Sequence, residues 1–284
     1  MQPAPMRGGS AAPAASRVLA QISEREFQAI RTWIHATAGI HLSAQKKALV
    51  VGRLAARLRH HGLETYGEYF ELLQSGAHPA ELQIAVDLLT TNETHFFREP
   101  KHFDFLRDKI LSAHPAGRAF RVWSAASSTG EEPYTLAMTL AESLGEAPWE
   151  IIASDLSSRV LDRARTGHYS MARAKTIPRA YLQKYCLKGI GSQEGTLLVG
   201  PWLRDRVRFT QINLVSQLPR LGEFDAIFLR NVMIYFDAAT KHAVVSRMLP
   251  HLVRGGHIFV GHSESLNGVS DALKSVQPSI YRRP

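Results

Sequence analysis

Cysteine is nearly absent from this sequence of 284 residues, which contains a single thiol, that of Cys186. One thiol excludes an internal disulfide and any zinc site built on paired cysteines. Apolar runs are short as well, and none approaches the ~18 to 20 residues that a membrane-spanning helix needs. Residues 1–20 contain no acid and are rich in Ala, Pro and Ser, and Pro13 and Ser16 interrupt any signal-peptide core. We therefore expect a disordered tail over residues 1–20 of a cytoplasmic protein.

Acids are also missing between Phe27 and Leu63, where six Lys or Arg occur. The whole chain has a net charge of +9 and a pI near 9.8, which suits a nucleic acid, an anionic membrane or an acidic protein as partner. An apolar repeat predicts a helix over residues 43–60 whose other faces are basic. These faces are either ordinary solvated surface or a docking surface for an acidic substrate. The candidate docking residues are Lys46, Arg53, Arg57 and Arg59.

The N-terminal part of the chain has the pattern of a small all-α domain over residues 21–89. Ser23 and Glu26 have the spacing of a capping box, which marks a helix start. The stretch that follows, TTNETHFFREP at residues 90–100, is polar and then aromatic. It is either a plain linker with two core phenylalanines or a segment that closes over a site at the strand ends beyond it.

The most informative stretch is RVWSAASSTGEEPY, residues 121–134. It predicts a buried strand, a turn of small residues and then a helix with acids in its first turn, as in the first unit of a nucleotide-binding α/β sheet. Only Gly130 matches a glycine-rich phosphate loop, and two acids would repel a pyrophosphate. The acids suit a ligand with positive charge, such as S-adenosylmethionine. An ordinary βα turn remains the alternative.

Strands and helices alternate beyond this turn, which predicts a mostly parallel sheet with ligands at the strand ends. Asp155 follows the second strand, 25 residues beyond Gly130, where doubly wound folds place the acid that holds a ribose. It could also cap the helix that we expect over residues 157–166. The alternation breaks between Gly167 and Arg206, where residues 181–187 and 196–199 suggest short antiparallel strands around glycine turns.

Four motifs taken together carry a resemblance to a known family. WSAASSTGEEPY, TNETHFFRE, LRNVMIYFD and GHSES occur in this order, and the sequence resembles the CheR family of chemotaxis receptor methyltransferases from about residue 21 to 282. The resemblance implies a class I (Rossmann-like) S-adenosylmethionine methyltransferase domain over residues 101–284. It also implies an antiparallel β-subdomain inserted at about residues 179–206 and the small all-α domain in front.

The same resemblance implies an activity and a set of site residues. The activity is transfer of the methyl group of S-adenosyl-L-methionine to glutamate side chains of chemoreceptors, which gives methyl esters and S-adenosyl-L-homocysteine. Arg98 and Tyr235 are the catalytic candidates, and no metal is implied. A peptide at the receptor's C-terminus is a possible second partner, bound at the β-subdomain. The implied cofactor contacts are Asn92, Thr94, Arg98, Glu132, Asp155, Asn213, Leu214, Arg230, Asn231 and Tyr235.

Three other functions compete with this one. A nucleic-acid methyltransferase fits the high pI, but its usual N-P-P-Y pocket motif is absent from Arg230-Asn231-Val232-Met233. A non-catalytic cofactor-binding scaffold is disfavoured by the intact acids and Tyr235, and a dinucleotide dehydrogenase by the glycine pattern. A glutamate substrate also fits the residues chemically, since it is anionic at neutral pH and needs no general base.

Overall fold

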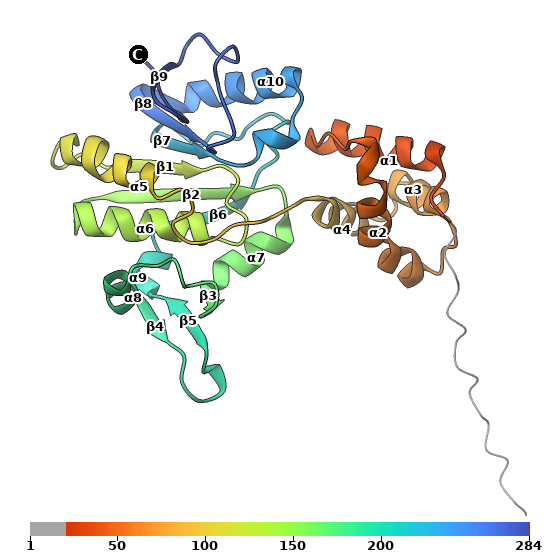
Figure 1. Cartoon of the computed structure of the whole chain (residues 1–284), viewed down its shortest axis with the longest axis horizontal. Coiled ribbons are helices and arrows are strands. Elements are labelled where there is room, and N and C mark those ends of the chain that lie inside the picture. Colours follow the sequence, from red (N-terminus) through yellow and green to blue (C-terminus); the bar gives the residue numbers. More distant parts are fainter. Residues whose placement is uncertain (1–20) are drawn as a thin grey trace, which may run out of the picture.

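The structure, a computed structural model, describes residues 21–284, so the tail expected over residues 1–20 lies outside the described residues. The first described unit is a bundle of four helices, which lies at one end of the molecule (Figure 1). Among residues 21–284, no helix combines the length and hydropathy that crossing a bilayer requires. The bundle helices are α1 (Glu24–Ala38), α2 (Lys47–His61), α3 (Tyr66–Gln74) and α4 (Pro79–Leu89).

The helix ends follow from local sequence. Ser23 and Glu26 form the expected capping box at the start of α1, each satisfying a backbone N–H of the other. Gly39 and Gly62 end α1 and α2 in the left-handed conformation, with φ of 70° and 68°, where a side chain would be strained. The apolar faces of the four helices then enclose one core built around Phe27, Leu54 and Tyr69.

A polar network crosses this bundle between α2 and α4. Arg57 donates two hydrogen bonds to the buried Glu81 carboxylate, one of them of 2.8 Å from Nε to Oε1, and Tyr69 donates a third of 2.6 Å. Burial alone would raise the pKa of the Glu81 carboxyl, but hydrogen bonds from Arg57, Tyr69 and His61 outweigh it and lower the pKa to about 2. Since this value is below the ordinary one, the network stabilises the fold fully above about pH 4.5 and is lost as the pH falls toward 2.

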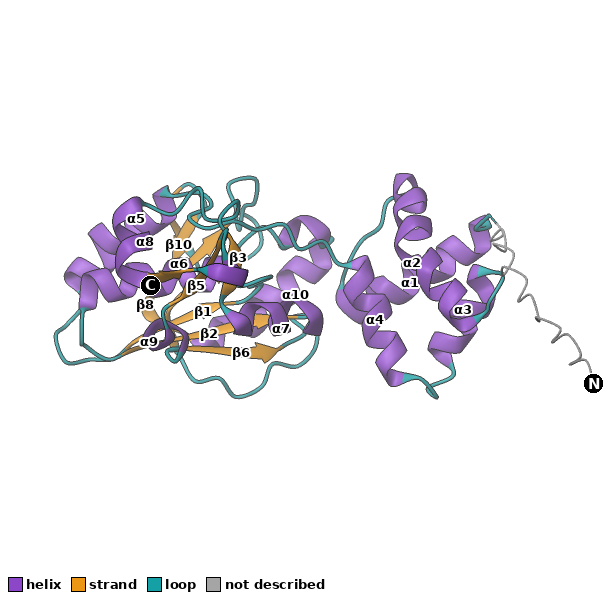
Figure 2. Cartoon of the chain, turned by 90° about the horizontal axis from the view of Figure 1, so that it is seen from below, coloured by secondary structure: helices purple, strands orange, loops and turns teal. Residues whose placement is uncertain are grey.

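The second unit is the predicted α/β domain, and its fold class is confirmed. Seven strands form one sheet in the order β6-β2-β1-β7-β8-β10-β9, in which the first five are parallel and β10 pairs antiparallel with both β8 and β9. The parallel strands point toward the helical bundle (Figure 2). The strands are β1 (Phe120–Ser124), β2 (Trp149–Asp155), β6 (Val207–Gln211), β7 (Phe224–Leu229), β8 (Leu252–Val260), β9 (Lys274–Gln277) and β10 (Ile280–Arg282).

Helices cover both faces of this sheet. Successive residues of one strand point to opposite faces, so Val122 belongs to the core beneath α6 and Trp123 to the core beneath α10. The exposed edge strand β9 was missed in the sequence because all four of its residues are exposed and it has no apolar alternation. The helices of this unit are α5 (Lys101–Phe105), α6 (Glu131–Leu144), α7 (Ser158–Thr166), α8 (Arg179–Tyr185), α9 (Pro201–Arg204) and α10 (Ala238–Met248).

A separate sheet of three antiparallel strands projects from the domain, as Figure 1 shows. It contains β3 (His168–Ser170), β4 (Cys186–Lys188) and β5 (Thr196–Val199), with β5 in the centre. The strand predicted over residues 181–187 is wrong, because most of it belongs to helix α8. Tyr181 and Tyr185, four residues apart, pack edge to face with ring centroids 5.5 Å apart, a pairing that a helix permits and a strand does not.

The Arg57–Glu81 network gives the first prediction. In Arg57→Met, a carboxylate that is 5% exposed loses its charged partner, so we expect the bundle to lose about 3 kcal/mol of stability. Hydrogen exchange of the α2 and α4 amides would report this loss locally, whatever the unfolding of the other domain. Arg59→Met is the matched control, since Arg59 is exposed on the same helix. If the α2 and α4 amides exchanged equally slowly in Arg57→Met and Arg59→Met, the network would contribute nothing to stability.

Candidate functional site

A pocket lies between the two domains, at the carboxyl ends of the parallel strands. Its wall is formed by the helical bundle on one side and by the loops after β1, β2, β6 and β7 on the other. Lys46 lines it too, whereas Arg53, Arg57 and Arg59 lie outside it. All the sequence-derived candidates for cofactor contact line this one pocket: Asn92, Thr94, Arg98, Glu132, Asp155, Asn213, Leu214, Arg230, Asn231 and Tyr235.

Asp155 ends strand β2 and presents its carboxylate to the pocket. One oxygen accepts from the backbone N–H of Ser128 (2.9 Å) and the other from that of Ser157 (3.0 Å), so the group is held rigidly. The helix that follows is capped instead by the Ser157 hydroxyl, which accepts from Val160 N–H, so the alternative role of Asp155 as N-cap is not seen. Burial raises the pKa of the Asp155 carboxyl, and the two backbone donors oppose that rise.

The two acids of the first turn of α6 have different partners. Glu132 lines the pocket, accepts from the Ser124 hydroxyl (2.7 Å) and forms an ion pair with Arg230 (2.8 Å). Glu131 is fully buried and is paired with Arg173, so it does not contribute charge to the pocket. Of the two acids expected beside a ligand, only Glu132 therefore lines the pocket.

Arg230 joins three segments of the site. Besides Glu132, its guanidinium donates to the Glu99 carboxylate (2.9 Å) and to the backbone carbonyl of Arg98. The side chain is 2% exposed and lies 5.5 Å from the Phe103 ring centroid. Arg230 therefore ties the linker to the ends of β1 and β7. Glu99 belongs to this network and was missed in the sequence, although it stands within the FFRE motif.

The linker over residues 90–100 is held in an unusual conformation. Phe97 and Glu99 both have positive φ, 53° and 58°, in the region that disfavours side chains. Hydrogen bonds from the body of the domain fix this segment; for example, Thr135 Oγ1 accepts from Phe97 N–H (3.1 Å). The Arg98 guanidinium lines the pocket and donates to the Glu93 carbonyl (2.8 Å). The linker is thus a wall of the site.

Glu264, a residue that sequence reasoning did not select, holds the loop after β7. Asn231 has a φ of 56°, and its N–H donates to Glu264 (2.8 Å). The same buried carboxylate accepts from the N–H groups of Ile234 (3.1 Å) and Gly261 (2.6 Å). Glu264 thereby fixes the conformation of the Asn231–Tyr235 loop. Its position in the GHSES motif was the available signal.

The helical bundle contributes directly to the site. Asn213, one of the cofactor candidates, donates from its side-chain amide to the Thr37 carbonyl (2.7 Å) of α1. The Tyr235 carbonyl accepts from His41 N–H (2.8 Å). Asp87 of α4 accepts from Ser158 Oγ (3.2 Å) and Arg159 N–H (3.3 Å) at the start of α7. These contacts fix the bundle as one wall of the pocket.

Two of the docking candidates have intramolecular partners, which corrects the expectation of a free basic stripe on α2. Arg53 donates to the carbonyls of Leu89 (3.1 Å) and Thr90 (2.9 Å), and so anchors the start of the linker. Arg57 is paired with Glu81, as described above. A helical stripe in sequence cannot reveal such pairing, because the partners come from α4 and the linker.

The residues present fit S-adenosylmethionine. Glu132 and Asp155 offer carboxylates for a cationic group and for a ribose, and Ala125 and Ala126 leave room beside the backbone. Ile212 and Leu214 offer an apolar wall for a purine ring. This sheet order, with acids after β1 and β2, is that of a class I S-adenosylmethionine-dependent methyltransferase.

Comparison with known families makes this assignment more specific. Residues 92–282 match the family described as "CheR methyltransferase, SAM binding domain", and residues 25–90 match "CheR methyltransferase, all-alpha domain". The chain belongs to the CheR methyltransferase family, and its methyl donor is S-adenosylmethionine. A chemotaxis protein methyltransferase of Escherichia coli is 44% identical over 92% of this chain and 91% of its own length. A chemotaxis protein methyltransferase of Salmonella typhimurium is 42% identical over 92% of this chain and 90% of its own length.

Glu264 gives the second prediction. In Glu264→Gln, one acceptor oxygen is replaced by an NH₂ group that faces backbone N–H donors, so the Asn231 loop loses its support. We expect the affinity for S-adenosylmethionine to fall about tenfold, or ~1.4 kcal/mol. Titration calorimetry measures this change, with Ser263→Ala as the control because Ser263 is an exposed neighbour. An unchanged affinity in the folded Gln variant would mean that the loop keeps its shape without Glu264.

Proposed function

We propose that this enzyme methylates glutamate side chains of chemoreceptors and that its pocket holds S-adenosylmethionine and the acceptor carboxylate together. The main support is that all ten candidate residues line one pocket, whose walls come from both domains. Membership of the CheR family and identities above 40% to chemotaxis protein methyltransferases support the same function. Cytoplasmic location, with recruitment to receptor arrays in the membrane, follows from this proposal.

Residues of the pocket have distinct proposed roles toward the cofactor. Asp155 accepts the ribose hydroxyls, for which each of its oxygens has one lone pair left beside its backbone bond. Glu132 offers its carboxyl group to the cofactor's ammonium; burial raises the pKa of this group, and Arg230 and the Ser124 hydroxyl oppose that rise. Leu214 and Asn213 flank the adenine. When bound, the cofactor supplies an electrophilic methyl group on a sulfonium.

Arg98 and Tyr235 are proposed to act on the acceptor. A glutamate carboxylate is already anionic at neutral pH, so the enzyme must position it rather than deprotonate it. The Arg98 guanidinium can orient this carboxylate by a charge-assisted hydrogen bond. Its existing bond to the Glu93 carbonyl limits its motion, so it orients the acceptor without neutralising it fully. The Tyr235 ring stabilises a cation in the pocket through its face.

The basic surface of the bundle is proposed to dock a glutamate-rich receptor helix. Lys46 lines the pocket, and Arg59 is exposed on α2, so these two remain available. Arg53 and Arg57 contribute to docking indirectly, by fixing the linker and helix α4. Opposite charge on the receptor helix then mainly raises the rate of encounter.

The third prediction tests the function itself. Purified protein with methyl-labelled S-adenosylmethionine and receptor-bearing membranes should transfer label to a receptor protein as an ester that alkali releases. Arg98→Ala should lower the rate by about a hundredfold or more, as expected for a lost orienting donor, without unfolding the protein. Arg107→Ala is the control, because Arg107 is exposed, does not line the pocket and is paired with Asp104 and Asp108.

Other outcomes of this assay would contradict the proposal. Label that appears only on added nucleic acid would favour a nucleic-acid methyltransferase, and alkali-stable label would indicate a different acceptor atom. No transfer in spite of cofactor binding would indicate a scaffold. Full activity of Arg98→Ala would place the acceptor away from the linker.

The small sheet is proposed to bind the C-terminal peptide of a receptor by strand addition at β4. Bonds from Gly189 N–H to Thr196 O (2.9 Å) and from Gly200 N–H to Tyr185 O (2.7 Å) flank the Leu187–Leu198 pair. Hydrogen-bonded pairs alternate along an antiparallel ladder. The backbone N–H and C=O of Leu187 therefore point to β5, and the backbone N–H of Lys188 points to the open edge. A peptide strand would pair there.

Exposed apolar side chains favour this edge. Leu187 is 56% and Ile190 81% exposed beside it, which gives a peptide apolar contacts in addition to main-chain bonds. Leu198 is excluded as an edge position, since β5 lies in the centre of the sheet. Tethering at this site would raise the local receptor concentration without a new contact at the active site.

The fourth prediction concerns this edge. Lys188→Pro removes one outward N–H but no bond of the β4–β5 ladder, so the fold should persist while peptide binding falls at least about fivefold, or ~1 kcal/mol for one lost hydrogen bond. Lys188→Ala keeps the N–H and should bind as the wild type does. Calorimetry with the terminal receptor peptide measures both. If removing that peptide from the receptors changes neither binding nor methylation, the tether does not exist.

A further inference from the structure

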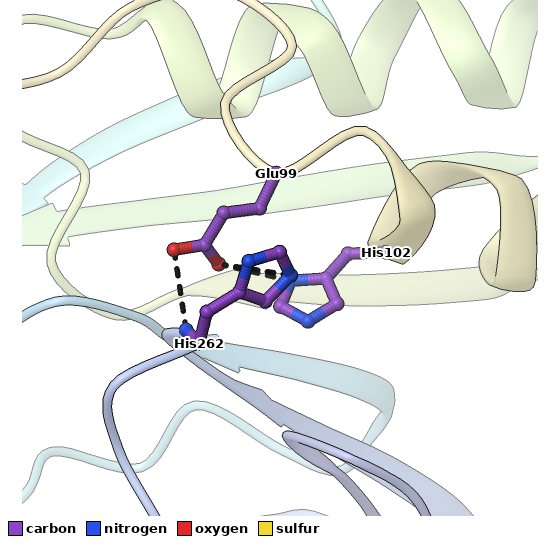
Figure 3. Close-up of side chains that lie close together, drawn as sticks. All are labelled: Glu99, His102 and His262. Atoms are coloured by element: carbon purple, nitrogen blue, oxygen red, sulfur yellow. Dashed lines mark hydrogen bonds and ion pairs between the residues drawn. The ribbon is translucent and has the colours of Figure 1, made fainter.

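Three potential metal ligands lie close together, as Figure 3 shows. The cluster consists of Glu99 from the end of the linker, His102 from α5 and His262 from the loop after β8. One ligand atom from each residue can be chosen so that all three atoms lie within 4.8 Å of one another. Among residues 21–284, this is the one group of at least three His, Cys, Asp or Glu with such spacing.

His102 is the most unusual member of the cluster. Its side chain is 2% exposed, and neither ring nitrogen has a hydrogen-bond partner among the described residues. An imidazole in its neutral form has a lone pair on one ring nitrogen, which is the atom that binds a metal ion. A buried imidazole without partners is costly, and a bound ion would satisfy one of its nitrogens.

The distances suit a small tetrahedral ion. Zinc bonds of about 2.0 to 2.2 Å to nitrogen and oxygen place neighbouring ligand atoms about 3.4 Å apart. His102 Nδ1 lies 3.5 Å from Glu99 Oε2, and His262 Nε2 lies 4.0 Å from the same oxygen. The His262 side chain is 52% exposed and free to close this small gap.

The surrounding charges also permit a cation. Arg230 is paired with Glu99 and would repel an ion, but Glu132 and Glu264 are close by in the same network. Two carboxylates, those of Glu99 and Glu132, therefore pair with one guanidinium, and a third, that of Glu264, accepts from the backbone N–H of the adjacent Asn231. A ligating carboxylate is commonly hydrogen-bonded by a second group, and Arg230 supplies that support here (2.9 Å).

We propose that Glu99, His102 and His262 bind a divalent transition-metal ion, Zn²⁺ first among them, with water completing the coordination. Two imidazoles and a carboxylate form a donor set that zinc prefers to magnesium or calcium. The ion acts as a regulator and takes no part in methyl transfer, because its ligands do not line the cofactor pocket.

The ion would be coupled to the cofactor through Arg230. Glu99 and Glu132 share this guanidinium, so a cation on Glu99 changes the charge balance around Glu132. The cofactor itself carries a sulfonium and an ammonium, and a second cation nearby opposes its binding. Zinc should therefore weaken cofactor affinity severalfold, and by linkage the cofactor should weaken zinc binding by the same factor.

Direct titration tests the site without relying on the proposed substrate. Untagged wild-type protein, titrated with Zn²⁺ in a calorimeter at neutral pH, should bind one ion per chain. His262→Ala should lower the affinity at least about tenfold, as for loss of a ligand. His168→Ala is the matched control, because His168 is an exposed histidine on the separate small sheet. His102→Phe, which keeps the ring packing against Phe259, should behave as His262→Ala does.

Several outcomes would overturn the proposal. Absence of binding to the wild type, or equal affinity in wild type and His262→Ala, would exclude this site. Cofactor affinity should then be measured with and without Zn²⁺ in both proteins. If Zn²⁺ lowers the cofactor affinity of the wild type but not that of His262→Ala, the coupling is supported. If Zn²⁺ leaves the cofactor affinity of the wild type unchanged, or lowers it equally in His262→Ala, the proposed coupling is wrong. Neither result depends on which protein is methylated.

Discussion

The site depends on one buried arginine. Arg230 binds Glu132 after β1, Glu99 in the linker and the Arg98 carbonyl, so that three segments distant in sequence meet at one guanidinium. A planar group with several donors can bridge two carboxylates, which a lysine cannot do in the same way. Without it, two acids would face each other in a buried place, and the linker would lose its anchor while Phe97 and Glu99 hold positive φ.

A second constraint is that the pocket has walls from two domains. Asn213 and Tyr235 are bonded to the helical bundle, and Asp87 of the bundle holds the start of α7. Two of the basic residues of α2, Arg53 and Arg57, are paired within the protein and are therefore not a free surface. Arg53 anchors the linker and Arg57 neutralises Glu81. A substrate that docks on the bundle therefore contacts a part that is rigidly joined to the site.

The acceptor's own charge decides which groups the pocket needs. A carboxylate acceptor needs no base, so neither of the two histidines that line the pocket, His41 and His95, has to remove a proton. Two further histidines, His102 and His262, meet Glu99 at a place that does not line the pocket. That arrangement separates a site that binds the cofactor from one where a metal ion regulates it.

The sequence by itself predicted the parallel strands and the capping box of α1, because strand alternation and cap spacing are local properties, whereas most of the pocket residues were implied by the family resemblance. It also gave Asp155 and Glu132 their places, since acids after β1 and β2 meet at the same edge of a parallel sheet. Only the tertiary structure decided which of two acids faces the pocket, that residues 181–187 are mainly helix, and that Arg53 and Arg57 are already paired. Those choices depend on partners far along the chain, such as Arg173 and Glu81, which no periodicity reveals.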